Sequence, residues 1–160
     1  MTTSMLQGLT VDLAVESGLQ LEEVPGEVRL VESETSYVVG HTERGWLLTR
    51  RFRNHEPVVE AVSDLLEGVE PVLVSKLGQA WRTQAGLPAL VTVRRGRPTP
   101  GAMLEEDATG RWTVRWDGGR RRVTDLNVVS AATLLRMAVV LDDADQFVKI
   151  EVLLGRGLLK

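Results

Sequence analysis

The side chains best suited to acid–base or metal chemistry are scarce in this chain. It has only two histidines, His41 and His55, and each stands in a turn-forming stretch without a second histidine at the spacing of a metal site. It has no cysteine, so a disulfide framework, a thiolate zinc site and a cysteine nucleophile are excluded together. We therefore expect no catalytic residue, no metal and no cofactor.

Two further motifs have the outline of a ligand site but lack its essential residues. Gly96 and Gly101 have the spacing of a phosphate-binding loop, but Ala102 and Met103 stand where that loop needs lysine and serine or threonine. Aspartates at 142, 143 and 145 suggest calcium, but the segment lacks the glycine and the glutamate of a calcium loop. An enzyme that uses two carboxylates alone stays an open alternative, because it needs only two acidic groups converging in one pocket.

Arginine and tryptophan, in contrast, concentrate in the second half of the chain. Eight arginines lie between residues 94 and 122, together with Trp112 and Trp116. Both types are enriched at the energetic centres of protein interfaces, because each combines a large contact area with directional hydrogen bonding. We predict that loops 94–101 and 117–122 contact a protein partner, with ordinary exposed turns as the alternative. The candidate partner-binding residues are Arg94, Arg95, Arg97, Thr99, Asp117, Arg120 and Arg121.

The same residue types would also suit a nucleic acid, with arginines on phosphates and tryptophans stacked on bases. The overall charge opposes that interpretation. The formal net charge is −3, and between residues 12 and 43 eight acidic residues stand against a single base, Arg29. Trp112, Val114 and Trp116 also share one face of a predicted strand, so part of that face is expected to be core. We expect no nucleic-acid partner.

The elements that must position these loops begin with short strands. After an N-terminal helix that ends near Gly18, apolar residues alternate over residues 19–24 and 27–32, on either side of a Pro-Gly turn. Two more apolar runs, residues 37–39 and 46–48, flank a polar turn. The pattern predicts an antiparallel meander of three or four strands.

The spacing of apolar residues then becomes helical. Residues 54–68 are predicted to form a helix, with Asn54 as its cap and Gly68 as its end. A second helix is predicted over residues 70–86, with Pro71 in its first turn, where a missing N–H costs little. Further strands are predicted over residues 90–93, 103–104, 111–116 and 120–123, and further helices over residues 128–141 and 142–154. An Asp-Gly-Gly turn joins the last two strands as a hairpin.

Size and composition indicate one globular domain. The chain has 160 residues, of which 43% are hydrophobic and 26% charged, which is ordinary for a folded domain. No apolar stretch is long enough to span a membrane, and the first 13 residues hold no lysine or arginine of a secretory signal, so a cytoplasmic location is expected. We predict a single α+β domain over residues 1–160, with one or more antiparallel sheets flanked by four or five helices.

Several segments resemble a known family. Residues 36–39 and 43–46, the stretch 72–90 with its Gly-Leu-Pro exit, and the tail from residue 128 are similar to the actinobacterial Immunity protein 61 family. That family is typified by the immunity factor for tuberculosis necrotizing toxin. The resemblance covers residues 36–90 and 125–160. We recognise no motif of the family in segment 94–122, so no partner-contacting residue is transferred there.

The resemblance implies a mixed sheet-and-helix protein, encoded with a toxin, that binds the toxin one-to-one and blocks its active site. It would perform no chemistry itself, and for the family's typical member the toxin degrades NAD. A secretion chaperone or adaptor that holds an exported protein is the alternative. Such a protein would present an exposed apolar groove.

Overall fold

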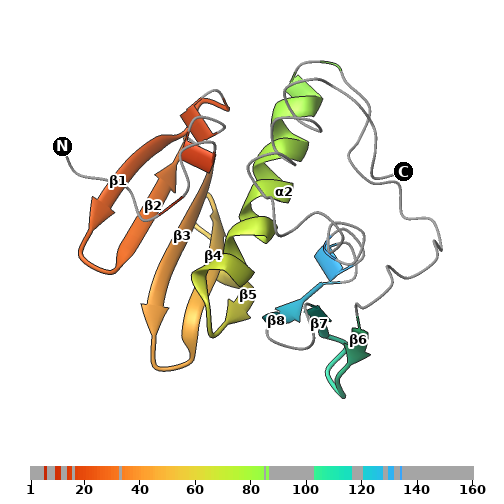
Figure 1. Cartoon of the computed structure of the whole chain (residues 1–160). Coiled ribbons are helices and arrows are strands. Elements are labelled where there is room, and N and C mark those ends of the chain that lie inside the picture. The colour runs from red at the N-terminus through yellow and green to blue at the C-terminus, as the bar shows by residue number, and fades with distance from the viewer. Residues whose placement is uncertain are drawn as a thin grey trace.

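The structure is a computed structural model, and it describes residues 6, 10–11, 14–15, 17–32, 34–84, 86, 103–116, 121–127, 130–131 and 134. Eight strands form one antiparallel sheet in the order β1-β2-β3-β4-β5-β8-β7-β6 (Figure 1). The strands are β1 (Gln20–Val24), β2 (Glu27–Val31), β3 (Thr35–Thr42), β4 (Gly45–Phe52), β5 (Val58–Ser63), β6 (Met103–Glu106), β7 (Trp112–Trp116) and β8 (Arg121–Leu126). One helix, α2 (Leu66–Gln84), follows β5.

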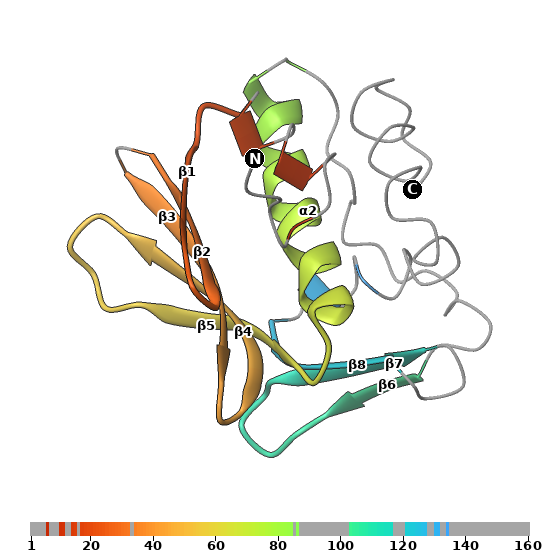
Figure 2. The ribbon, with the colours of Figure 1, turned by 60° about the vertical axis from the view of Figure 1, so that its left-hand side comes forward.

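The sheet is sharply bent between β5 and β8. Figure 2 shows β1–β5 and β6–β8 meeting at an angle, with α2 lying inside that angle. The helix packs against β4, β5 and β8, so it supports both halves. The hydrophobic core fills the space between α2 and the sheet, and its largest fully buried apolar side chains are Leu30, Leu48, Leu73, Leu77, Leu126 and Leu134.

The first four strands confirm the predicted meander. Each neighbouring pair from β1 to β4 is antiparallel, and Gly26 and Gly45 occupy the tight turns with φ angles of 76° and 103°. Only glycine adopts such angles readily, which is why local turn chemistry was informative here. The β7–β8 hairpin is also as predicted, with Trp116 opposite Arg121. Residues 90–93 and 142–154 lie outside the described part of the chain.

The helix predicted over residues 54–68 is wrong. Residues Val58–Ser63 form the central strand β5, and α2 begins at Leu66 and continues through Gly68 and Pro71. β-branched residues are frequent in this stretch, and a β-bulge opposite Leu48 and Thr49 inserts Glu60 into the strand. The extra residue shifts the apolar spacing toward that of a helix, which explains the misassignment.

The expected α+β class with four or five flanking helices is also wrong. The described residues are mostly sheet, with α2 as their one complete helix. Thr10, Val11, Ala14 and Val15 are helical near the N-terminal end, as are Ser130, Ala131 and Leu134 after β8. The first predicted helix of the middle segment is in fact the strand β5. The second is α2, which begins before its predicted start and runs through Gly68 without a break.

Gly68 is instead a point where α2 lies directly against Ser63 of β5. A Cβ atom at this position would lie 2.2 Å from Ser63 Oγ, 2.8 Å from Ser63 Cβ and 3.3 Å from Val123 Cγ2. The Gly68→Ala substitution should therefore lower the free energy of unfolding by about 1–3 kcal/mol, although alanine is normally the better helix former. Urea unfolding of Gly68→Ala, with the Ser63→Gly/Gly68→Ala double variant as the rescue, measures this. If Gly68→Ala alone were more stable than the wild type, the space between position 68 and Ser63 would not be too small for a Cβ atom.

Candidate functional site

Most of the predicted partner-binding residues lie outside the described part of the chain. These are Arg94, Arg95, Arg97, Thr99, Asp117 and Arg120. Arg121 is the first residue of β8 and pairs through its backbone with Trp116. The structure therefore brings one predicted residue to a defined position, at the start of the strand that borders the bend, and the role of all seven stays a prediction.

The three tryptophans whose side chains the structure describes contribute to packing. Trp46, Trp81 and Trp112 are partly buried and pack against the hydrophobic core. The imidazole of His41 lies edge-on to Trp46, with ring centroids 5.1 Å apart. His55 stacks on Phe52, and no group of three or more potential metal ligands occurs among the described residues.

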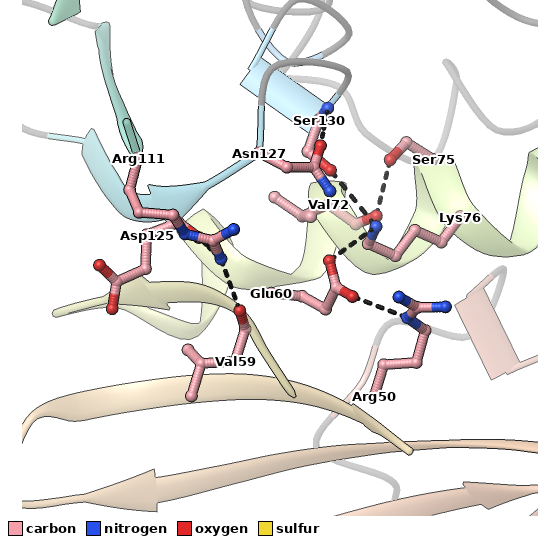
Figure 3. Close-up of polar contacts among 10 residues, drawn as sticks. All are labelled: Arg50, Val59, Glu60, Val72, Ser75, Lys76, Arg111, Asp125, Asn127 and Ser130. Carbon is pink, nitrogen blue, oxygen red and sulfur yellow. Dashed lines mark hydrogen bonds and ion pairs between the residues drawn. The ribbon is translucent and has the colours of Figure 1, made fainter. Parts of the chain in front are cut away.

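Side chains, rather than a long ladder of backbone hydrogen bonds, hold the bend of the sheet together. Val62 of β5 is paired with Thr124 of β8, and the Ser63 hydroxyl donates a hydrogen bond of 2.6 Å to the Arg122 carbonyl. The guanidinium of Arg111 donates to the carbonyl of Val59 at 2.7 Å and to that of Asp125 at 2.5 Å. Arg111 therefore connects β5 to β8 directly (Figure 3).

Asp125, beside the bend, has an unusual backbone. Its φ is 59°, in the left-handed region that costs a non-glycine residue energy. Its carboxylate forms an ion pair of 2.5 Å with Arg44, in the β3–β4 turn, and its carbonyl accepts the Arg111 hydrogen bond. Two arginines from distant parts of the chain thus hold one strained residue, a feature that concentrates at functional sites.

A polar cleft of 290 Å³ opens beside this strained residue. Val123 faces α2, since its Cγ2 approaches Gly68, so Arg122 and Thr124 point to the opposite side of the sheet. The cleft is thus on the side of the bend away from the helix. It is lined by Arg44, Val62, Ser63, Asp64, Arg122 and Thr124.

The wall of the cleft formed by the β3–β4 turn is fixed by local hydrogen bonds. The Thr42 hydroxyl accepts a hydrogen bond from the Arg44 N–H and donates one to the Gly45 carbonyl, each at 3.1 Å. A Cβ atom on Gly45 would lie 2.7 Å from the Ser63 carbonyl oxygen, so the turn is packed directly on the end of β5. Arg44 is therefore presented from a rigid support.

A buried ion cluster lies on the opposite, helix-facing side of the sheet. The bulge turns Glu60 toward α2, where its side chain is only 2% exposed. One carboxylate oxygen accepts from Arg50 Nε at 2.7 Å and the other lies 3.1 Å from Lys76 Nζ, as Figure 3 shows. Burial by itself raises the pKa of Glu60, but the Lys76 ammonium and the Arg50 guanidinium together lower it below its ordinary value. The cluster is a support for β4, β5 and α2.

A solved structure has the same fold as this chain. Rv3902c from M. tuberculosis has a TM-score of 0.76 with this chain at 16% sequence identity, covering 99% of this chain and 95% of that one. At this level of identity the likeness establishes the fold alone.

The family comparison is more specific. The model of Immunity protein 61 matches residues 13–145, which include every strand of the sheet and α2. The chain belongs to the Immunity protein 61 family. This confirms the resemblance stated above and extends it across the arginine-rich segment 94–122, where no likeness to the family was expected. Comparison with curated proteins gives no match.

For this member of the Immunity protein 61 family, sequence reasoning missed most of the cleft. Arg44 was assigned only to a polar turn, and Ser63 and Asp64 were placed inside a helix that does not exist. Arg122 was included in loop 117–122 but was not among the seven chosen residues. The one usable signal was the Thr-Glu-Arg-Gly sequence at 42–45, a turn that carries an arginine.

Within the described part of the chain, no helix is both long and apolar enough to cross a membrane.

Proposed function

We propose that this protein is the immunity factor for a toxin encoded beside it, and that it binds the toxin one-to-one in the cytoplasm and blocks the toxin's active site. The match to Immunity protein 61 over residues 13–145 is the observation that carries this proposal. The protein acts by occlusion rather than by catalysis. An NAD-degrading enzyme is the toxin class that the family resemblance favours.

The geometry of the described residues supports a binding role. The bend of the sheet holds a polar cleft on fixed walls, and rigid surfaces bind with a smaller entropic cost than mobile ones. Loops 94–101 and 117–122 are proposed as further contacts, since arginine is a frequent anchor of interfaces. Arg122, the last residue of the second of these loops, lines the cleft and connects the two proposals.

Co-expression in a sensitive host tests the proposal. The wild-type chain is expected to restore growth to cells that produce the neighbouring toxin, and a tagged copy should retain the toxin at equal stoichiometry. Leu73→Asp places a charge in the fully buried core and should abolish protection by unfolding the protein. Full toxicity in the presence of folded wild-type protein would contradict the immunity role.

The chaperone alternative receives no specific support. The exposed large apolar side chains of the described residues are Val15, Val24, Phe52, Val58, Leu65, Met103 and Leu104. They lie on β1, β4, β5, β6 and the connections rather than along one element, whereas a chaperone groove would gather them.

A further inference from the structure

We propose that the cleft at the bend of the sheet receives a carboxylate side chain of the toxin, with Arg122 as its principal partner. This inference rests on the proposed function and names the chemistry of the contact. The cleft contains two arginines, Arg44 and Arg122, against one acidic residue, Asp64. Because Asp125 balances Arg44, the remaining charges of the cleft are those of Arg122 and Asp64. The preference for an anion rests on Arg122 and Thr124, which present donor groups together on β8.

The two arginines differ in how free they are to bind. Arg44 is already paired with Asp125 at 2.5 Å. Arg122 forms no ion pair with any other described residue, and neither does Asp64, so these two opposite charges face the cleft without being within ion-pair distance of each other. A carboxylate entering the cleft would find a guanidinium that is still available for a bidentate hydrogen bond.

The neighbouring side chains extend this recognition. Thr124 is two residues from Arg122 on β8, so its hydroxyl lies on the same face of the strand and offers a second donor. Leu65 follows Asp64 in the chain and is 46% exposed, so an apolar side chain comes directly after a residue of the cleft. An apolar side chain next to a polar pocket is a common composition of an interface centre.

The cleft has the dimensions and rigidity that a single side chain requires. Its volume of 290 Å³ is large enough to receive one side chain of a partner. Close packing of Gly45 on Ser63 fixes the wall formed by the β3–β4 turn, and the ion pair with Asp125 holds Arg44 in place there. The structure thus maintains this geometry before a partner arrives.

Calorimetric titration of the purified chain with the purified toxin domain of the neighbouring gene, inactivated in its active site, tests the proposal. Arg122→Ala is expected to weaken binding by about 30-fold or more, as for loss of one partner of a buried charge pair. Asp64→Asn is expected to leave binding unchanged or to tighten it, because it removes a charge that repels the carboxylate. Arg53→Ala is the matched control, since Arg53 is an exposed, ion-paired arginine that directly follows β4 and is not part of the cleft, and its effect should stay within about 3-fold.

A second measurement locates the contact. The chain has no cysteine, so Thr124→Cys supplies a single thiol inside the cleft. Alkylation of this thiol by iodoacetamide should slow at least about 10-fold in the complex, as expected for a group removed from solvent.

The melting temperature is the folding control for the titration. Equal melting temperatures of Arg122→Ala and the wild type would show that weaker binding of the toxin reflects the lost contact and not unfolding.

The outcomes separate this inference from the proposed function. Unchanged binding by Arg122→Ala, or unprotected alkylation in the complex, would overturn the cleft and leave the immunity role intact. Weakened binding by Asp64→Asn with no effect of Arg122→Ala would show that a cation enters instead, which also overturns the proposal. Failure of the wild-type chain to bind the toxin would overturn the proposed function and the cleft together.

Discussion

Replacing Glu60 by alanine is expected to lower the free energy of unfolding by about 3–5 kcal/mol, the usual cost of removing one partner of a buried ion pair. The substitution would leave Lys76, whose side chain is 17% exposed, without its carboxylate, and would strip Arg50 of its hydrogen bond. Equilibrium unfolding in urea measures the loss. Glu34→Ala is the control, because Glu34 pairs with Arg53 on the surface and its loss should cost less than about 1 kcal/mol.

The same cluster predicts how stability depends on pH. Because the folded state lowers the pKa of Glu60, the stabilisation is complete above the ordinary glutamate pKa of 4.5 and is lost as pH falls through the lower folded value. Glu60→Gln keeps the shape but cannot titrate, so its stability should fall less than that of the wild type below pH 4.5. Parallel pH profiles for the two proteins would show that Glu60 does not contribute this dependence.

Replacing Arg111 by alanine is expected to cost about 2–4 kcal/mol and to loosen the bend of the sheet. The side chain donates charge-assisted hydrogen bonds to the carbonyls of Val59 and Asp125, each worth about 1.5–3 kcal/mol when made by a charged group. Both bonds come from the same Nη2 nitrogen, so we expect their joint contribution to be smaller than the sum of the two. Without it, the strained backbone of Asp125 loses the contact that holds it against β5. Urea unfolding measures the cost.

Amide hydrogen exchange distinguishes local loosening from a general loss of stability in Arg111→Ala. Exchange should accelerate most in β8 and least in β2 and β3, which are paired far from the bend. Arg29→Ala is the matched control, because Arg29 forms an exposed ion pair with Glu27 on β2 and should change neither stability nor exchange at β8. Uniform acceleration across the sheet would contradict a role of Arg111 specific to the bend.

Local sequence signals were sufficient where a turn determines the structure. Gly26 and Gly45 need positive φ angles, and the apolar residues on either side alternate, so the meander of β1 to β4 followed directly. The same reasoning failed for β5, where the bulge at Glu60 places Val58, Val59 and Val62 at a spacing that also fits a helix. Gly68 misled for a related reason, because glycine serves close packing there and not chain breaking.

The candidate site was hardest to predict because its residues are far apart in the chain. Arg44 and Asp125 are 81 residues apart, and Val62 meets Thr124 only because β5 and β8 become neighbours. No periodicity or spacing within one segment contains that information. Composition did indicate arginine as the important residue type, but it directed attention to loops rather than to the bend where Arg44, Arg111 and Arg122 converge.

The most direct test of the central claim is the catalytic activity of the neighbouring toxin measured against increasing amounts of this protein. We expect activity to fall linearly and to be abolished near one equivalent, and we expect substrate and protein to compete for the toxin. Full activity in a saturated complex would show that the protein binds without blocking the active site. Full activity with no complex formed would contradict the immunity function itself.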